Sequence, residues 1–237
     1  MNTHTTTIAL TCGAVAGPLF TVAGLAQAAT RAGFDPARHQ LSLLSNRSLG
    51  WVQMLNFIIT GGLFLTGAMG MRATLTSGRG SKWGPRLIAA FGAGLIGAGI
   101  FRPDPAFGFP PGTPDAKPDP VSWHGGLHYS IASAAFLALI IAAVVFARRF
   151  AAARNRGWAL GSAAAGAALL AGVAAVSSGS ANAVGSVWLI ASALAAFLWA
   201  SAVAAHLRSA SRRITTVQAR RRPAVDLTTA AGPVGPR

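Results

Sequence analysis

The chain has 237 residues, of which 52% are hydrophobic and only 11% are charged. Soluble globular domains carry about 25% charged residues. This chain therefore has too little polar surface for a water-soluble protein of its size, and we expect a lipid bilayer to surround it. The single cysteine, Cys12, excludes an intrachain disulfide and any metal site built from several cysteines.

Six stretches without Asp, Glu, Lys or Arg are candidates for membrane-spanning helices. About 20 apolar residues cross the hydrocarbon layer, at about 1.5 Å per residue. The third stretch is short, but Arg86 and Arg102 at its ends have side chains that reach back to the interface. The predicted spans are residues 8–29, 51–71, 87–101, 123–147, 158–176 and 187–206. The sequence therefore predicts an all-α membrane protein, a bundle of six transmembrane helices.

The basic residues indicate the orientation of these helices. The connections after the second and fourth spans and the C-terminal tail together hold 15 Lys and Arg, whereas the other connections hold 5. By the positive-inside rule, both termini should be cytoplasmic. Because these residues fall between apolar runs rather than on one water-facing surface, we predict no nucleic-acid partner.

The two ends of the chain carry different signals. Ala26-Gln27-Ala28 resembles a signal-peptide cleavage site, but residues 1–7 contain no Lys or Arg, so we expect the first span to be retained. Residues 1–206 are predicted to form the six-helix domain, and residues 207–237 a basic, disordered cytoplasmic tail. The seven Arg of this tail favour contact with anionic lipids of the inner leaflet.

Small residues recur at helical spacing in several spans. Gly13 and Gly17 form one such series, and Gly62, Thr66 and Gly70 form another. Small side chains let helix backbones approach closely in a membrane. We therefore expect tight packing between helices of one chain, rather than a dimerisation motif.

A proline-rich loop runs into two histidines at the start of the fourth span. Seven of the 13 prolines lie between Arg102 and Val121, and because proline fixes φ, this loop should be stiff, as a lid over the bundle would be. His124 and His128, four residues apart after the predicted N-cap Ser122, share one helical face. The positive end of the helix dipole disfavours protonated rings there, so both histidines are biased toward the neutral form that binds metal or accepts a proton.

A zinc site is one interpretation of these histidines. Two histidines need a third and usually a fourth ligand, and Asp104 and Asp119 are the candidates in this connection. The other interpretation is that the rings hydrogen-bond to headgroups, water or loop carbonyls, and we favour it because HxxxH alone is a weak motif. We therefore predict no cofactor, and the alternative is zinc bound by His124, His128 and Asp104.

A polar stripe follows the second span, with Gln53, Asn56 and Thr60 at positions i, i+3 and i+7. Buried amides in a membrane must find partners or line a wet cavity. We therefore expect the stripe to face the bundle interior and, together with Ser42, to line a pocket on the outer side. The alternative, which we favour somewhat, is that these residues only fasten the outer loops to the bundle.

Three stretches of the sequence together resemble a known family. They are HQLSLLSNRSLGWVQMLNFIITGGLF, GAGIFRPDPAFGFPPGTP and HGGLH. They are similar to the DUF998 family of bacterial multi-span membrane proteins over residues 17–203. The resemblance implies a six-helix integral membrane protein and no particular activity, and we expect a multi-pass protein of the bacterial plasma membrane. The residues that match the family pattern are Ser42, Ser45, Trp51, Asp104 and His128. This match favours a pair of His128 with Asp104 over the two histidines.

Three functions stay open at this point. We favour a non-enzymatic membrane component with an outward-facing polar pocket. The first alternative is a membrane-embedded hydrolase, with or without a metal, in which Asp104, His128 and Ser45 are catalytic. The second is a carrier for a neutral or lipidic molecule, because the predicted spans lack the Asp, Glu, Lys and Arg that ion-coupled carriers place in mid-membrane. The lipid bilayer is the partner that we predict, and the sequence does not identify a protein partner.

Overall fold

The computed structural model describes residues 1–177 and 183–221 of the chain. In chain order, its elements are α1 (Thr3–Thr30), the short 3-10 helix η1 (Leu41–Ser45), α2 (Gly50–Thr74), α3 (Trp83–Ile100), α4 (Trp123–Ala152), α5 (Arg156–Ser177) and α6 (Ala183–Arg221). Each of the six α-helices contains a segment long and apolar enough to cross a membrane. The predicted all-helical fold with six spans is therefore confirmed.

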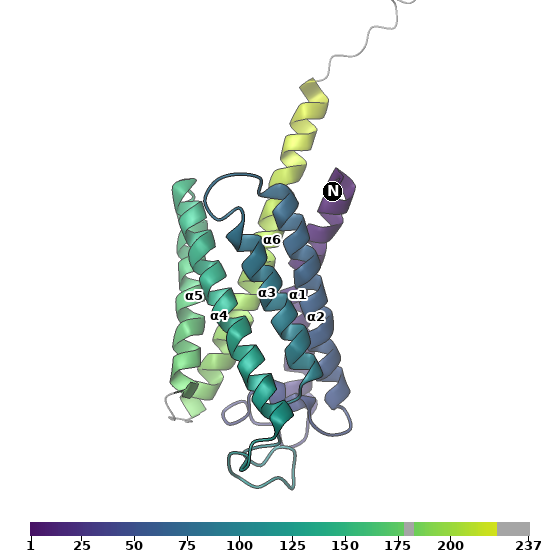
Figure 1. Ribbon diagram of the computed structural model, residues 1–237, viewed down its shortest axis with the longest axis vertical. Helices are drawn as coiled ribbons and strands as arrows, with labels where there is room; N and C mark the ends of the chain where they lie inside the picture. Colours follow the sequence, from purple (N-terminus) through teal and green to yellow (C-terminus); the bar gives the residue numbers. More distant parts are fainter. Residues whose placement is uncertain (178–182, 222–237) are drawn as a thin grey trace, which may run out of the picture.

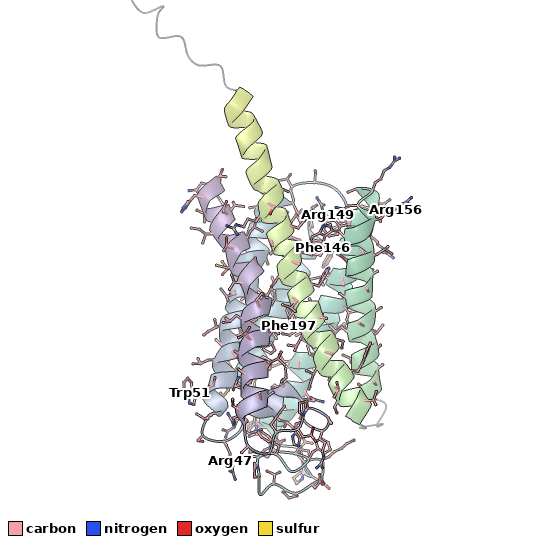
Figure 2. The ribbon with its side chains drawn as sticks, turned by 180° about the vertical axis from the view of Figure 1, so that it is seen from behind. Arg47, Trp51, Phe146, Arg149, Arg156 and Phe197 are labelled. Atoms are coloured by element: carbon pink, nitrogen blue, oxygen red, sulfur yellow. The ribbon has the colours of Figure 1, made fainter. Side chains whose placement is uncertain are left out.

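The helices run side by side along one axis (Figure 1). Each helix packs against the next one in the chain, and α6 returns to α1, so the bundle closes into a ring. Residues 31–49 and 101–122 lie together at one end, which we name the loop end. Arg47 lies at this end, whereas Arg149 and Arg156 lie at the opposite end (Figure 2). The bundle thus has two chemically different ends.

The last helix differs from its prediction at its C-terminal end. We expected disorder from residue 207, but α6 continues to Arg221. Residues 207–221 contain neither Gly nor Pro and hold five Arg, which is a good helix former, so nothing in this stretch stops the helix. The predicted disorder of residues 222–237 lies outside the described residues.

The centre of the bundle is built from phenylalanine rings contributed by different helices. The ring of Phe197 on α6 lies 4.8 Å from those of Phe20 on α1 and Phe91 on α3, measured between centroids. Phe64 on α2 lies 5.1 Å from Phe91. All three pairs are tilted or edge-to-face, the arrangements that aromatic rings prefer. Figure 2 shows Phe197 about midway along the bundle, so this cluster joins α1, α2, α3 and α6 at mid-height.

Glycines set the distance between α1 and its neighbours. A methyl group added to Gly67 on α2 would lie 2.6 Å from the Cα of Gly13 on α1. On the α6 side, Ser201 donates to the carbonyl oxygen of Gly13 and accepts from the N–H of Gly17, both at 2.8 Å. The predicted close packing within the chain is therefore present at Gly13 and Gly17. Gly62, which we had placed in a similar series, faces open space.

We expect alanine to have opposite effects at two glycines of α2. Gly67→Ala should lower the free energy of unfolding by about 1–3 kcal/mol, because the new methyl group pushes α1 and α2 apart. Gly62→Ala should raise it by about 0.5–1 kcal/mol, because nothing obstructs the methyl group and alanine favours the helix. Thermal unfolding in detergent measures both variants, and an equal effect at the two positions would contradict the described α1–α2 contact.

The orientation of the bundle remains a prediction that labelling can test. In a Cys12→Ser background, Asp115→Cys should react with a membrane-impermeant maleimide in intact cells, because we place the loop end outside. Arg154→Cys, at the connection between α4 and α5, should react only after the cells are permeabilised. The reverse pattern would show that the termini lie on the outer side.

Candidate functional site

His39 joins the two long connections at the loop end. Its Nε2 donates to the carbonyl oxygen of Phe107 at 2.9 Å, and its Nδ1 accepts from the N–H of Asp35 at 2.9 Å. The roles follow from the partners, because a carbonyl only accepts and an amide N–H only donates. The ring is 3% exposed and packs against Phe34 and Phe109. His39 therefore fixes the proline-rich loop (residues 101–122) onto the first loop (residues 31–49).

Two arginines add further contacts between these loops. Arg38 forms an ion pair with Asp115, and Arg47 donates a hydrogen bond to the carbonyl oxygen of Pro111. Phe109 is buried, with its ring edge against Phe34 at 5.4 Å. The proline-rich loop thus forms a packed wall at the loop end.

Asp104 binds the N-terminus of α4. Its Oδ2 accepts from the backbone N–H of Ser122 at 2.9 Å, and its Oδ1 accepts from the Ser122 hydroxyl at 2.5 Å. Ser122 in turn caps α4 by accepting from the N–H of Gly125 at 3.1 Å. A side chain at Gly125 would collide with the Asp104 carboxylate. The negative charge therefore lies against the positive end of the helix dipole, where it stabilises the helix.

His128 binds the other side of the same junction, the C-terminal end of α3. Its Nδ1 lies 3.0 Å from the carbonyl oxygen of Ala98 and 2.6 Å from that of Phe101. The last carbonyls of a helix lack partners within the helix. Since both partners only accept, Nδ1 carries the proton, and in the neutral ring Nε2 has a free lone pair. The ring is 2% exposed.

Of the predicted zinc ligands, His124 and Asp104 both contact Ser122, whereas His128 binds carbonyls at the end of α3. His124 Nδ1 lies 2.9 Å from the Ser122 hydroxyl and 4.0 Å from Asp104 Oδ1. No hydrogen bond joins His128 to Asp104 in the described part of the chain. Among residues 1–177 and 183–221, no group of three or more His, Cys, Asp or Glu is placed to hold a metal ion. The residues present do not fit the zinc alternative.

The predicted polar stripe of α2 faces the bundle interior. Gln53 and Thr60 are fully buried and Asn56 is 5% exposed. Gln27 on α1 donates to Gln53 Oε1 at 2.7 Å, and Asn56 donates to the carbonyl oxygen of Phe20 at 3.2 Å. Within the described residues, four buried atoms of this group have no partner: Gln27 Oε1, Gln53 Nε2, Asn56 Oδ1 and Thr60 Oγ1. Such atoms are commonly satisfied by buried water, so we expect ordered water between α1 and α2.

A cavity of about 90 Å³ lies in the loop-end half of the bundle. Small and aliphatic side chains of α3, α4 and α6 contribute to its wall. Four phenylalanines complete the apolar part of the wall: Phe20, Phe57, Phe136 and Phe197. Its polar residues are Gln40, Ser42, His128 and Tyr129. Of the residues predicted to line a pocket, Ser42 is in this wall, whereas Gln53, Asn56 and Thr60 lie between α1 and α2 instead. The cavity is therefore more apolar than the pocket that we predicted.

Ser45, the predicted nucleophile, lies apart from any base. It belongs to η1 and is 1% exposed, and its hydroxyl oxygen has no hydrogen-bond partner among the described residues. Nucleophilic catalysis needs a base within hydrogen-bonding reach of the hydroxyl. Ser45, Asp104 and His128 therefore form no catalytic triad here.

Sequence reasoning missed His39 and Tyr129. His39 occurs in a loop with no motif around it, and its contacts with the proline-rich loop come from residues 107 and 109, so no local spacing signals its role. Tyr129 is the only tyrosine of the chain and follows His128 directly, which could have marked it. It lines the cavity, and its hydroxyl forms no hydrogen bond within the described residues.

We expect Asp104→Ala to lower the free energy of unfolding by about 1.5–3 kcal/mol, because it removes hydrogen bonds to a buried charged group. Asp115→Ala, in the same loop, is the matched control. Its ion pair with Arg38 is solvent-exposed, so the loss should be less than about 1 kcal/mol. Thermal unfolding of both variants in detergent makes the comparison, and equal losses would contradict the structural role of Asp104.

The comparisons with known proteins identify the family but no activity. No curated protein and no solved structure matches this chain. A family model described as "Protein of unknown function (DUF998)" matches residues 14–206, which is most of the chain and includes α2 to α5 and large parts of α1 and α6. Because the matched region holds Ser42, Ser45, Asp104, His124 and His128, the junction between α3 and α4 lies within it. The chain belongs to the DUF998 family.

Proposed function

We propose that this protein is a non-enzymatic membrane component that binds a small neutral amphiphile in the cavity of the loop-end half. The observation that carries the proposal is the wall of this cavity. It combines aromatic and aliphatic side chains with His128, whose Nε2 has a lone pair and no hydrogen-bond partner among the described residues. Ligand sites typically combine an apolar lining with a few polar groups that orient the ligand.

The lining supports a neutral ligand. None of the described residues in the cavity wall is Asp, Glu, Lys or Arg, and a charged group without a partner is costly to bury. His128 Nε2 offers an acceptor, so the ligand should carry a hydroxyl or amide N–H that donates to it. A volume of about 90 Å³ suits part of an alkyl chain rather than a whole lipid.

The arrangement of α4 and α6 supports entry from within the membrane. The cavity wall takes residues from both helices, including Tyr129, Phe136, Ile190 and Ala193. We name the end opposite the loop end, where Arg149 and Arg156 lie, the arginine-rich end. Figure 1 shows α4 lying close to α5 at this end and leaning away from it toward the loop end. Because these residues lie within candidate membrane spans, we expect the lining at the depth of the lipid chains, where an amphiphile dissolved in the bilayer is concentrated.

The hydrolase alternative has less support from the geometry. Both oxygens of Asp104 accept from Ser122, and His128 Nδ1 donates to carbonyls of α3. A base that activates a nucleophile must contact it, and no hydrogen bond among the described residues joins the Ser45 hydroxyl to a base. We therefore favour binding over hydrolysis.

We further propose that the protein lies in the plasma membrane of a bacterium, with the arginine-rich end in the cytoplasm. The excess of Lys and Arg in the connections at that end supports this orientation. The Arg residues after residue 206 would then contact anionic lipids of the inner leaflet.

A cavity-filling variant tests the binding proposal. We expect 1-octanol, a neutral alcohol, to raise the unfolding temperature of the wild-type protein in detergent by about 2–4 °C for each kcal/mol of binding. Ala193→Leu fills the cavity from α6 and should abolish this shift, whereas Ala195→Leu, at an exposed position of the same helix, should retain it.

Octane separates the apolar contribution from the polar one. If His128 accepts from the ligand, octane should stabilise the wild-type protein less than 1-octanol does. Equal responses of the wild type and Ala193→Leu to 1-octanol would show that the alcohol acts through the detergent, and would overturn the proposal.

A further inference from the structure

A second hollow lies on the surface of the loop end. It is a cleft of about 420 Å³ between the first loop and the proline-rich loop. Its walls carry the basic side chains of Arg47 and Arg102, together with His124 and Asn46. The cleft and the interior cavity share no lining residue, so this site is independent of the proposed function.

The charge of the cleft is positive. None of the described residues that line it is Asp or Glu. The nearest carboxylate, that of Asp104, lies 4.0 Å from His124 and uses both oxygens on Ser122. Asp115 is paired with Arg38, outside the cleft. The two guanidinium groups therefore have no carboxylate partner among the described residues.

A buried donor in the wall points to a missing partner. Asn46 is 4% exposed, and its backbone oxygen accepts from Arg31 at 2.7 Å. Its Nδ2 is buried and has no hydrogen-bond partner in the part of the chain that the structure describes. Nearly all buried polar groups are hydrogen-bonded, so an orphaned amide beside two arginines calls for an acceptor.

The walls of the cleft are stiff. Pro103, Pro105, Pro110 and Pro111 contribute to them, and proline restricts the backbone. Arg47 donates to the carbonyl oxygen of Pro111, which fixes its position across the cleft. A site that is rigid before binding loses less entropy when the ligand arrives.

We propose that this cleft binds a phosphate group, held by Arg47, Arg102 and Asn46. The guanidinium fork matches the oxygens of a phosphate, and the bonds that it forms are charge-assisted. At the loop end of a membrane protein, the group can belong to a lipid headgroup or to a free phosphate. Figure 2 shows Arg47 at this end, beyond the ends of the helices.

The test is isothermal titration calorimetry on the purified full-length protein in dodecyl maltoside. The probes are inorganic phosphate and dihexanoyl phosphatidic acid, each added to a buffer without phosphate. Saturable binding of at least one probe is expected. Binding of both identifies a site for phosphate as such, whereas binding of the lipid alone identifies a headgroup site.

Arg102→Gln should weaken the binding about tenfold, which corresponds to the loss of one charge-assisted contact. Arg102→Lys keeps the charge and should lose less. The matched control is Arg38→Gln, which removes a neighbouring charge outside the cleft and should leave the affinity unchanged.

The side chain of Arg102 makes no hydrogen bond within the described residues, so its variants should fold, and thermal unfolding confirms this. No saturable binding of either probe, or equal affinities for the wild type, Arg102→Gln and Arg38→Gln, would overturn the proposal.

Discussion

Hydrocarbon offers no hydrogen bond to a polypeptide, and this constraint explains most of the described structure. Inside each span, the helix satisfies its own backbone. The ends of the helices are different, because the first N–H groups and the last carbonyls have no partner within the helix. At the loop end, the chain therefore has to supply partners from side chains. Ser122 and Asp104 satisfy the start of α4, and His128 satisfies the end of α3.

The same constraint gives the loop end its two hollows. A ring of six helices filled by phenylalanines leaves an apolar space where α4 and α6 contribute to one wall. Above the helices, the two long connections enclose a cleft that water and ions can reach, and arginines line it. One hollow suits a neutral, largely apolar molecule, and the other suits an anion. Their difference follows from their depth, because an unpaired charge is stable only near water.

The sequence predicted the spans better than the site. Apolar length and the absence of charge identify a membrane helix without knowledge of its neighbours, which is why all six helices were found. The predicted end of α6 was wrong because the lack of a sustained apolar pattern was taken as disorder, although Arg is a good helix former in water. The stripe of Gln53, Asn56 and Thr60 was correctly assigned to the interior, since periodicity reports the face of a helix. Which cavity a residue lines depends on neighbouring helices, and spacing does not contain that information.

His128 shows why a structural and a functional interpretation need not exclude each other. Its bonds to two carbonyls of α3 fix the ring and place the proton on Nδ1. That choice leaves Nε2 as an acceptor in a wall that is otherwise mostly apolar. A histidine free to change its tautomer could either donate or accept, and would discriminate poorly between ligands. In the function that we propose, the residue that closes the end of α3 would therefore also give the cavity a preference for a ligand that donates a hydrogen bond.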